Sequence, residues 1–165
     1  MRGGKNAEGF PDPTATIAIG NVAREEKRKM LENYNKHMKP NEVIEAVERK
    51  HGCCKKEALS ILRKEIPKEK YFQEKILKAI KRAYPEAYVQ KITLGYYSQR
   101  GLPDILAIID GHYFGFEVKR PIVGNLTAIQ GKTRDAIRKA GGTAEVVSYP
   151  EEALAAIKDY FSWEG

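Results

Sequence analysis

The sequence of 165 residues has few side chains that could form disulfide bonds or bind zinc. It has only two cysteines, and they are neighbours, Cys53 and Cys54. Adjacent cysteines bridge only through a strained ring, and two thiols fall short of a closed zinc site even if His51 joins them. We therefore expect a reduced pair of thiols and no disulfide framework.

Long apolar runs and a nucleophilic triad are also missing. No run reaches the roughly 18 apolar residues of a membrane-spanning helix, and no apolar stretch follows the basic residues at the N-terminus, so neither a membrane span nor a secretory signal is expected. The three histidines, His37, His51 and His112, are scattered, which argues against a Ser-His-Asp set. These absences favour a cytoplasmic protein in which any hydrolytic chemistry uses a metal ion.

Charge of one sign is in excess. The chain has 29 Lys and Arg against 22 Asp and Glu, a net charge of +7, which favours a polyanionic partner such as nucleic acid. The surplus is uneven, because residues 1–70 hold 16 basic and 11 acidic side chains whereas residues 71–165 hold 13 and 11. The net charges of +5 and +2 put most of the surplus in the N-terminal part.

The N-terminal part is expected to be helical. Residues 1–11 are glycine-rich and polar and are predicted to be disordered, whereas residues 12–66 are predicted to form a small all-α module. Its last two helices, separated at His51-Gly52, have the outline of a helix-turn-helix. Any helical hairpin has that outline, so DNA reading, dimerisation and plain packing remain open. Residues 11–27 also faintly resemble the start of small phage transcription regulators.

The C-terminal part, residues 71–162, changes pattern. Its periodicities predict a helix, three strands, a helix, a strand and a final helix, which is a mixed α/β domain. The last two of the three strands flank Asp110-Gly111, a strong signal for a hairpin with a two-residue turn. We expect that hairpin to be largely buried on both faces.

The turn sets which residues oppose each other across this hairpin. With a two-residue turn, Asp104 lies across from Glu117, and Lys119 follows on the same face. A bulge near Pro103 would shift this register by one residue. Opposed carboxylates destabilise a strand pair, so a proton, Lys119 or a divalent cation must offset the repulsion. A structural Glu117–Lys119 ion pair beside a turn aspartate explains the spacing as well as a metal site does.

A motif at these positions resembles a known nuclease signature. The run from Gly101 to Asp104, with Glu117-Val118-Lys119 after twelve intervening residues, resembles the PD-(D/E)xK pattern. Within that superfamily, residues 71–150 look like a VRR-NUC domain, because Gly124–Gln130 reads G-x-L-T-x-x-Q and Glu74 lies on the leading helix. The resemblance implies a restriction-endonuclease-like core.

The resemblance also implies roles for single residues. Asp104, Glu117 and the backbone carbonyl of Val118 would bind Mg²⁺ or Mn²⁺, with Glu74 contacting the metal directly or through water. Lys119 would act on the attacking water or on the phosphate, and Gln130 would support the site from the next helix. Two of these residues have simpler explanations. Glu74 lies on a lysine-rich helix and fits a solvated position, and Gln130 completes a capping box that begins at Thr127.

The expected function is therefore metal-dependent endonuclease activity on DNA. Branched DNA, such as a Holliday junction, is one candidate substrate, in phage replication, recombination or repair, and a homodimer would present two sites to it. The alternative is a DNA-binding phage regulator that carries a vestigial nuclease fold.

Overall fold

The computed structural model describes residues 39–93 and 101–163. The chain divides into two compact units between Ile66 and Pro67. The expected disordered start and the first predicted helix, residues 1–11 and the segment from Asp12, lie outside the described residues. Within the described ranges, no helix is long and apolar enough to cross a membrane.

The first unit contains two helices joined by a short turn. Helix α2 spans Pro40–His51 and begins with proline at its first position, where the missing N–H costs nothing. It ends at Gly52, whose left-handed backbone (φ 60°, ψ 36°) allows the chain to turn into α3, Lys55–Glu65. The two helices pack through a small apolar core. Its buried members are Val43, Ile44, Ala58, Leu62 and Ile66.

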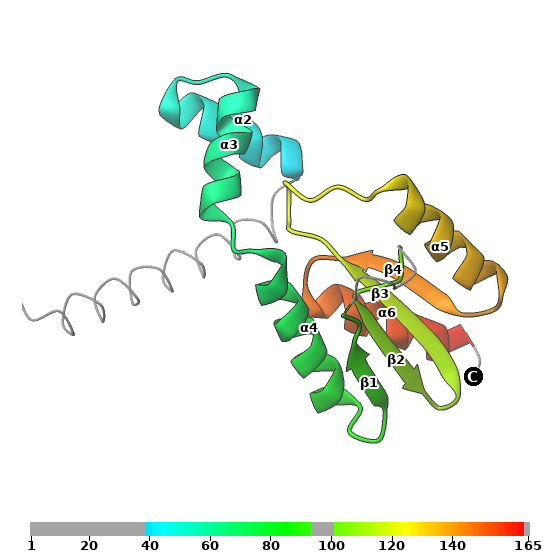
Figure 1. Cartoon of the computed structure of the whole chain (residues 1–165). Helices are drawn as coiled ribbons and strands as arrows, with labels where there is room; N and C mark the ends of the chain where they lie inside the picture. The colour runs from blue at the N-terminus through cyan, green and yellow to red at the C-terminus, as the bar shows by residue number, and fades with distance from the viewer. Residues whose placement is uncertain (1–38, 94–100, 164–165) are drawn as a thin grey trace, which may run out of the picture. The chain divides into compact units, whose positions relative to one another are not determined.

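The second unit is a mixed α/β domain, which confirms the predicted class. Its elements are α4 (Glu69–Ala83), β1 (Tyr88–Lys91), β2 (Ile105–Ile109), β3 (His112–Val118), α5 (Ala128–Lys139), β4 (Thr143–Val147) and α6 (Pro150–Trp163). The strands form one sheet in the order β1-β2-β3-β4 (Figure 1). The first three strands are antiparallel, and β4 runs parallel to β3.

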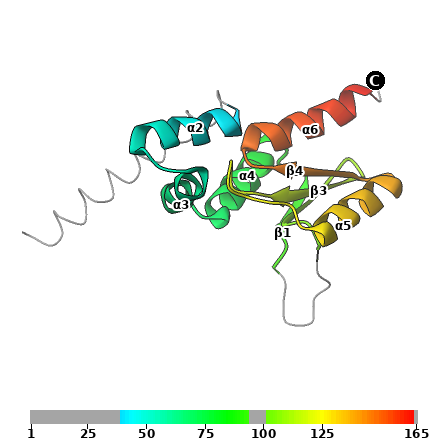
Figure 2. The same ribbon diagram turned by 90° about the horizontal axis from the view of Figure 1, so that it is seen from above.

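Helices cover the two faces of this sheet unequally. Helices α4 and α6 pack side by side on one face, and α5 lies on the other (Figure 2). Alternate residues of β3 follow this division, since Phe114 and Phe116 are fully buried beneath α4 and α6. Burying a side chain of this size stabilises the fold by about 2 kcal/mol.

The hairpin has the register that the turn predicts. Ile109 pairs with His112 and Ile105 pairs with Phe116, so no bulge intervenes between these pairs. Asp110 and Gly111 both have positive φ, 47° and 81°, as a two-residue turn of this kind requires.

The expectation that the hairpin is buried on both faces was wrong. On the α5 side, Ile108 is 41% exposed, and Leu106 is only half-buried. The reason is that α5 packs against β3 and β4 and leaves β2 largely uncovered on that side. The sheet thus has one fully covered face and one that opens to solvent.

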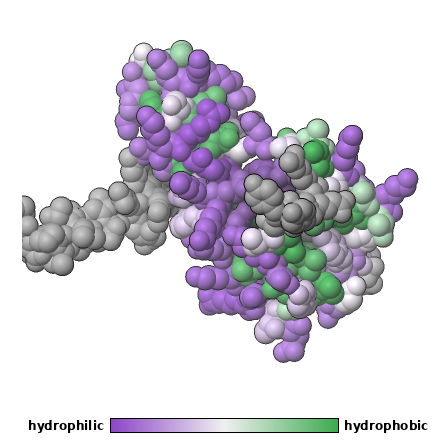
Figure 3. Space-filling model, in the orientation of Figure 1, coloured by the Kyte–Doolittle hydropathy of each residue, from purple (hydrophilic) through white to green (hydrophobic). Residues whose placement is uncertain are grey.

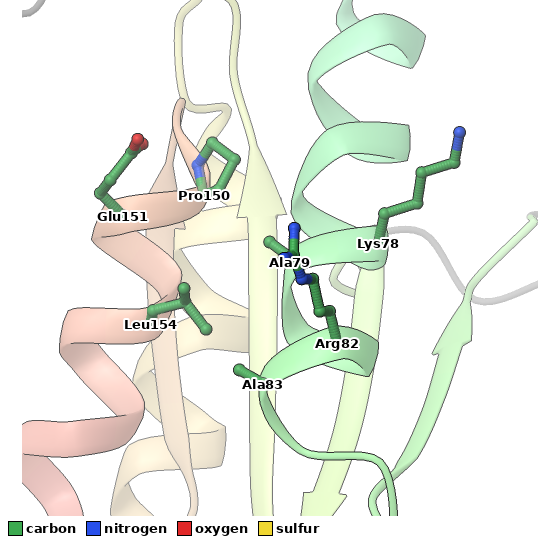
Figure 4. A pocket seen from close by; sticks show the side chains of 7 residues that line it. All are labelled: Lys78, Ala79, Arg82, Ala83, Pro150, Glu151 and Leu154. Carbon is green, nitrogen blue, oxygen red and sulfur yellow. The ribbon is translucent and has the colours of Figure 1, made fainter.

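A groove of about 530 Å³ runs between α4 and α6 (Figure 4). Lys78 and Arg82 lie on its α4 wall, and Glu151 and Leu154 lie on its α6 wall. The groove is on the covered side of the sheet, away from the face that carries Glu117.

Candidate active site

Four elements bring polar side chains to one end of the sheet. Asp104 directly precedes β2, Glu117 is near the end of β3, and Lys119 directly follows that strand. The first turn of α5 adds Gln130, and the first turns of α4 add further polar side chains. Residues far apart in sequence therefore meet where two antiparallel strands end.

The Asp104 carboxylate is held by two donors. Gln73 Nε2 donates to its Oδ1 at 2.9 Å, and the backbone N–H of Val118 donates to its Oδ2 at 2.8 Å. The second contact occurs where the β2–β3 ladder ends. The last ladder pair is Ile105 with Phe116, so the N–H of Val118 lies beyond the ladder and donates to the Asp104 side chain instead.

The backbone carbonyl of Val118 lies on the same side of its strand. In a ladder pair, one residue turns both its N–H and its C=O toward the same neighbour. The next N–H, that of Lys119, points the other way and donates to the carbonyl of Val147 in β4 at 2.9 Å. The Val118 carbonyl and the Asp104 carboxylate therefore share one side of the sheet end.

The Glu117 carboxylate is buried and receives two donors on one oxygen. Lys119 Nζ donates to Oε1 at 2.5 Å, and Gln130 Nε2 donates to the same atom. Glu117 is 6% exposed and Lys119 is 9% exposed. Among the described residues, both hydrogen bonds to this carboxylate fall on Oε1, which leaves Oε2 open to a further ligand.

Negative charge exceeds positive charge in this cluster. Burial raises the pKa of Glu117 from 4.5 to about 7, and the nearby Asp104 and Glu69 charges add to the rise. The hydrogen bond and the charge of Lys119 oppose this rise without cancelling it. Burial also raises the pKa of Glu69, against the charge of Lys119. The cluster thus has three carboxyl groups against two cationic side chains, Lys119 and Arg120, the latter acting on Glu69.

Gln130 makes two sets of contacts, one within the helix cap and one with Glu117. Its Oε1 accepts hydrogen bonds from the backbone N–H and the hydroxyl of Thr127, each at 2.9 Å, which completes the capping box of α5. Its Nε2 donates to Glu117. The helix cap therefore fixes the amide group that holds the carboxylate.

Helix α4 turns Gln73 and Glu69 toward the site, whereas the expected residue was Glu74. Glu74 is exposed, with 52% of its side chain accessible, and lies 3.9 Å from Lys70 on the outer side of the helix. Gln73 is instead buried against Asp104, and Glu69 Oε2 lies 3.9 Å from Lys119 Nζ. The acidic residue of α4 that approaches Lys119 is therefore Glu69, and Glu74 has the exposed position that its lysine-rich helix also allowed.

The sequence contains a signal for this arrangement. The buried residues Phe72, Ile76 and Ile80 mark the inner stripe of α4, and Gln73 is the polar member of that stripe. Positions four residues apart share a helix face, so Glu69 lies on the same side as Gln73. A polar residue inside an apolar stripe indicates a partner in the interior.

Two glycines of the motif are required by close packing. A Cβ at Gly124 would lie 2.7 Å from the carbonyl oxygen of Arg120 and 3.0 Å from Lys119 Cβ. At Gly101, where φ is +90°, a Cβ would lie 2.6 Å from Ile129 of α5. Both glycines therefore hold loops against the segments that position the charged cluster.

The donor set fits a magnesium-type ion more closely than a closed cage. Within the described residues, no group of three or more His, Cys, Asp or Glu side chains has the arrangement of a metal site. Two carboxylates and a backbone carbonyl are oxygen donors, and Mg²⁺ commonly takes one or two carboxylates and completes its shell with water and substrate phosphate. Asp104, Glu117 and the carbonyl of Val118 meet that requirement.

Comparisons with known proteins give one likeness to report. No protein-family model matches the chain, and no curated protein matches its sequence. A solved structure described as a VRR_NUC domain is similar at 25% sequence identity, over 53% of this chain and 96% of that chain, with a TM-score of 0.44.

Proposed function

We propose that the unit from Pro67 onward is a metal-dependent nuclease that hydrolyses phosphodiester bonds in DNA. The observation that carries the proposal is the cluster at the sheet end. There the carboxylates of Asp104 and Glu117 flank an open edge, and Lys119 Nζ lies 2.5 Å from Glu117 Oε1. The resemblance of residues 101–130 to the PD-(D/E)xK pattern supports the same assignment.

Asp104, Glu117 and the carbonyl of Val118 would hold Mg²⁺ or Mn²⁺. Such an ion supplies Lewis-acid activation of the phosphate and lowers the pKa of a bound water. The protein prepares the position by fixing the ligands before the ion arrives. Gln73 orients Asp104, and Gln130 orients Glu117, so each carboxylate has a second residue that sets its direction.

Lys119 would act on the phosphate and the attacking water. Its ammonium group is largely buried but keeps 11% of its side chain accessible, so it lies at the boundary between the sheet end and solvent. A positive charge held in a partly desolvated place stabilises the negative charge that develops on the phosphoryl oxygens. Glu117 and Glu69 hold it there from two sides, at 2.5 and 3.9 Å.

The substrate would be DNA, with branched DNA as the form to examine first. Endonucleolytic resolution of a four-way junction requires two cuts, and residues 39–93 and 101–163 contain one such cluster, so a homodimer would supply the second. A phage replication, recombination or repair setting follows from the resemblance alone. A vestigial nuclease fold fits less well, because both carboxylates and the lysine are present and Lys119 is bonded to Glu117.

The experiment is a cleavage assay on duplex, flap, single-stranded and four-way DNA with Mg²⁺ or Mn²⁺. The wild type should cut at least one substrate, and Lys119→Ala should reduce the rate by about 10²–10³-fold. Glu74→Gln is the matched control, since Glu74 is an exposed acidic residue of α4. No cutting of any substrate by the wild type would exclude the nuclease, and light scattering would report whether a dimer forms.

A further inference from the structure

We propose that α2, the turn at residues 52–54 and α3 form a helix-turn-helix that binds duplex DNA through the exposed face of α3. The proposal concerns the unit that ends at Ile66 and does not depend on cleavage by the other unit. It assigns a function to a module for which the sequence left DNA reading, dimerisation and plain packing open.

The geometry of the two helices separates a helix-turn-helix from an antiparallel hairpin. Three residues join α2 to α3, and Gly52 adopts the left-handed conformation that the turn requires. In Figures 1 and 2, α3 runs across α2 and not back along it, since Figure 2 shows α3 end-on while α2 lies lengthwise. A steep crossing over a three- or four-residue turn is typical of DNA-binding pairs of helices.

The apolar core fixes which side of α3 faces outward. Ala58 and Leu62 are buried, at 2% exposure or less, four residues apart on one side of the helix, and Ile66, which follows the helix, is buried as well. The opposite side therefore faces solvent. Its exposed residues are Lys56, Glu57, Ser60, Arg63 and Lys64. Hydrophilic side chains predominate on the visible surface of this unit (Figure 3).

Positive charge is in excess on this face. Lys56, Arg63 and Lys64 lie on it with one exposed acidic residue, Glu57. Glu57 is engaged at the start of the helix, where its Oε2 accepts the backbone N–H of Cys54 at 3.1 Å. Helix α2 differs, since Glu42 and Glu45 lie among its exposed residues. The second helix of the pair is thus the one suited to phosphate.

The spacing of the lysines suits the major groove of B-form DNA. A rise of 1.5 Å per residue separates Lys56 from Lys64 by about 12 Å along the helix axis. The major groove is about 12 Å wide and admits an α-helix, and lysines about 12 Å apart along the helix axis would reach different backbone phosphates while Ser60 lies between them. The deep, narrow major groove of A-form RNA does not admit such a helix. The partner is therefore duplex DNA.

The test measures DNA binding by the full chain in the presence of chelator, so that cleavage does not interfere. Fluorescence anisotropy with a duplex would compare the wild type with the double variant K56A/K64A. The control is R49A/K50A, which removes two exposed positive charges from α2 in the same unit. K56R/K64R preserves the charge of the proposed face, and S60E places a negative charge at its centre.

K56A/K64A should weaken binding at least about tenfold in low salt. It should also lower the slope of log affinity against log salt concentration by about 1.8, because each lost phosphate contact removes about 0.9. S60E should weaken binding similarly, and K56R/K64R should bind like the wild type. R49A/K50A should change affinity by less than about threefold, because its charges lie off the proposed face. Circular dichroism would verify that each variant is folded.

Three results would each overturn the proposal. One is an equal loss of affinity in K56A/K64A and R49A/K50A, which would indicate general charge attraction. Another is equal binding of double-stranded RNA of the same sequence, and the third is no duplex binding by the wild type. Because no arm requires cleavage, these outcomes are distinct from failure of the proposed nuclease.

Discussion

Replacing Glu117 by glutamine removes the buried carboxylate charge of the cluster at the sheet end. The residue is 6% exposed, and burial beside Asp104 and Glu69 raises its pKa from 4.5 to about 7. Glutamine has the same length and keeps an oxygen that accepts from Lys119 and Gln130. The substitution therefore changes the charge and preserves the packing.

The direction of the effect follows from the raised pKa. The folded state binds the Glu117 proton more tightly than the unfolded state, whose pKa is near the ordinary 4.5. The stabilising contribution is thus complete below pH 4.5 and is lost as the pH rises to about 7. At about 1.4 kcal/mol per pKa unit, the free energy of unfolding of the metal-free wild type should fall by up to about 3 kcal/mol.

The assay is urea denaturation in chelator at several pH values between 5 and 8. Far-UV circular dichroism is the suitable signal, because the single tryptophan, Trp163, is 89% exposed and reports little of the core. Glu117→Gln should show a clearly shallower decline with pH than the wild type, while the control Glu74→Gln, whose carboxylate is exposed, should decline like the wild type. Equal slopes in all three proteins would refute the burial of an ionisable Glu117.

The remaining predictions concern metal, helix α4 and the loop after β3. Asp104→Asn should abolish cleavage. It should make the metal-free protein more stable, because it removes one charge from the cluster. The variant should also lose most of the rise in melting temperature that Mn²⁺ gives the wild type. A destabilised metal-free variant would contradict this. Glu69→Gln should reduce activity or metal affinity by about tenfold, as expected for a residue beside Lys119, whereas Glu74→Gln should change either by less than twofold. If Glu69→Gln and Glu74→Gln had equal effects on the cleavage rate and on metal affinity, the assignment of Glu69 to the site would be wrong. Gly124→Ala should lower cleavage more than thermal stability, since its Cβ would press on the Lys119 segment, and a normal rate would show that the loop adjusts.

Local rules in the sequence were enough for the hairpin and the residues at its end. Asp110-Gly111 allows both residues of the turn to have positive φ, and a two-residue turn leaves one register, so the facing of Ile105 and Phe116 follows from the chain itself. The capping box at Thr127 is likewise local, because its partners are three residues apart. The mixed α/β class follows from the periodicity of the segments.

Exposure of the hairpin did not follow from these rules. Leu106 and Ile108 look like core residues in the sequence, yet both lie on the face that α5 leaves partly open. A strand that is apolar on both faces does not indicate how far a helix distant in sequence extends across it. That coverage depends on where α5 packs against β3 and β4.

Only the tertiary structure decided which side of α4 meets the carboxylates. Neighbouring helix positions such as Gln73 and Glu74 point about 100° apart, so the rotation of the helix about its axis decides which of them meets the site. The rotation is set by the burial of Phe72, Ile76 and Ile80 against the sheet and α6, contacts that link distant parts of the chain. The sequence alone thus determined the hairpin register from Ile109–His112 to Ile105–Phe116, because turn geometry is local. Packing decided that Gln73 and Glu69, and not Glu74, approach the site, because only the assembled core fixes the orientation of a helix about its axis.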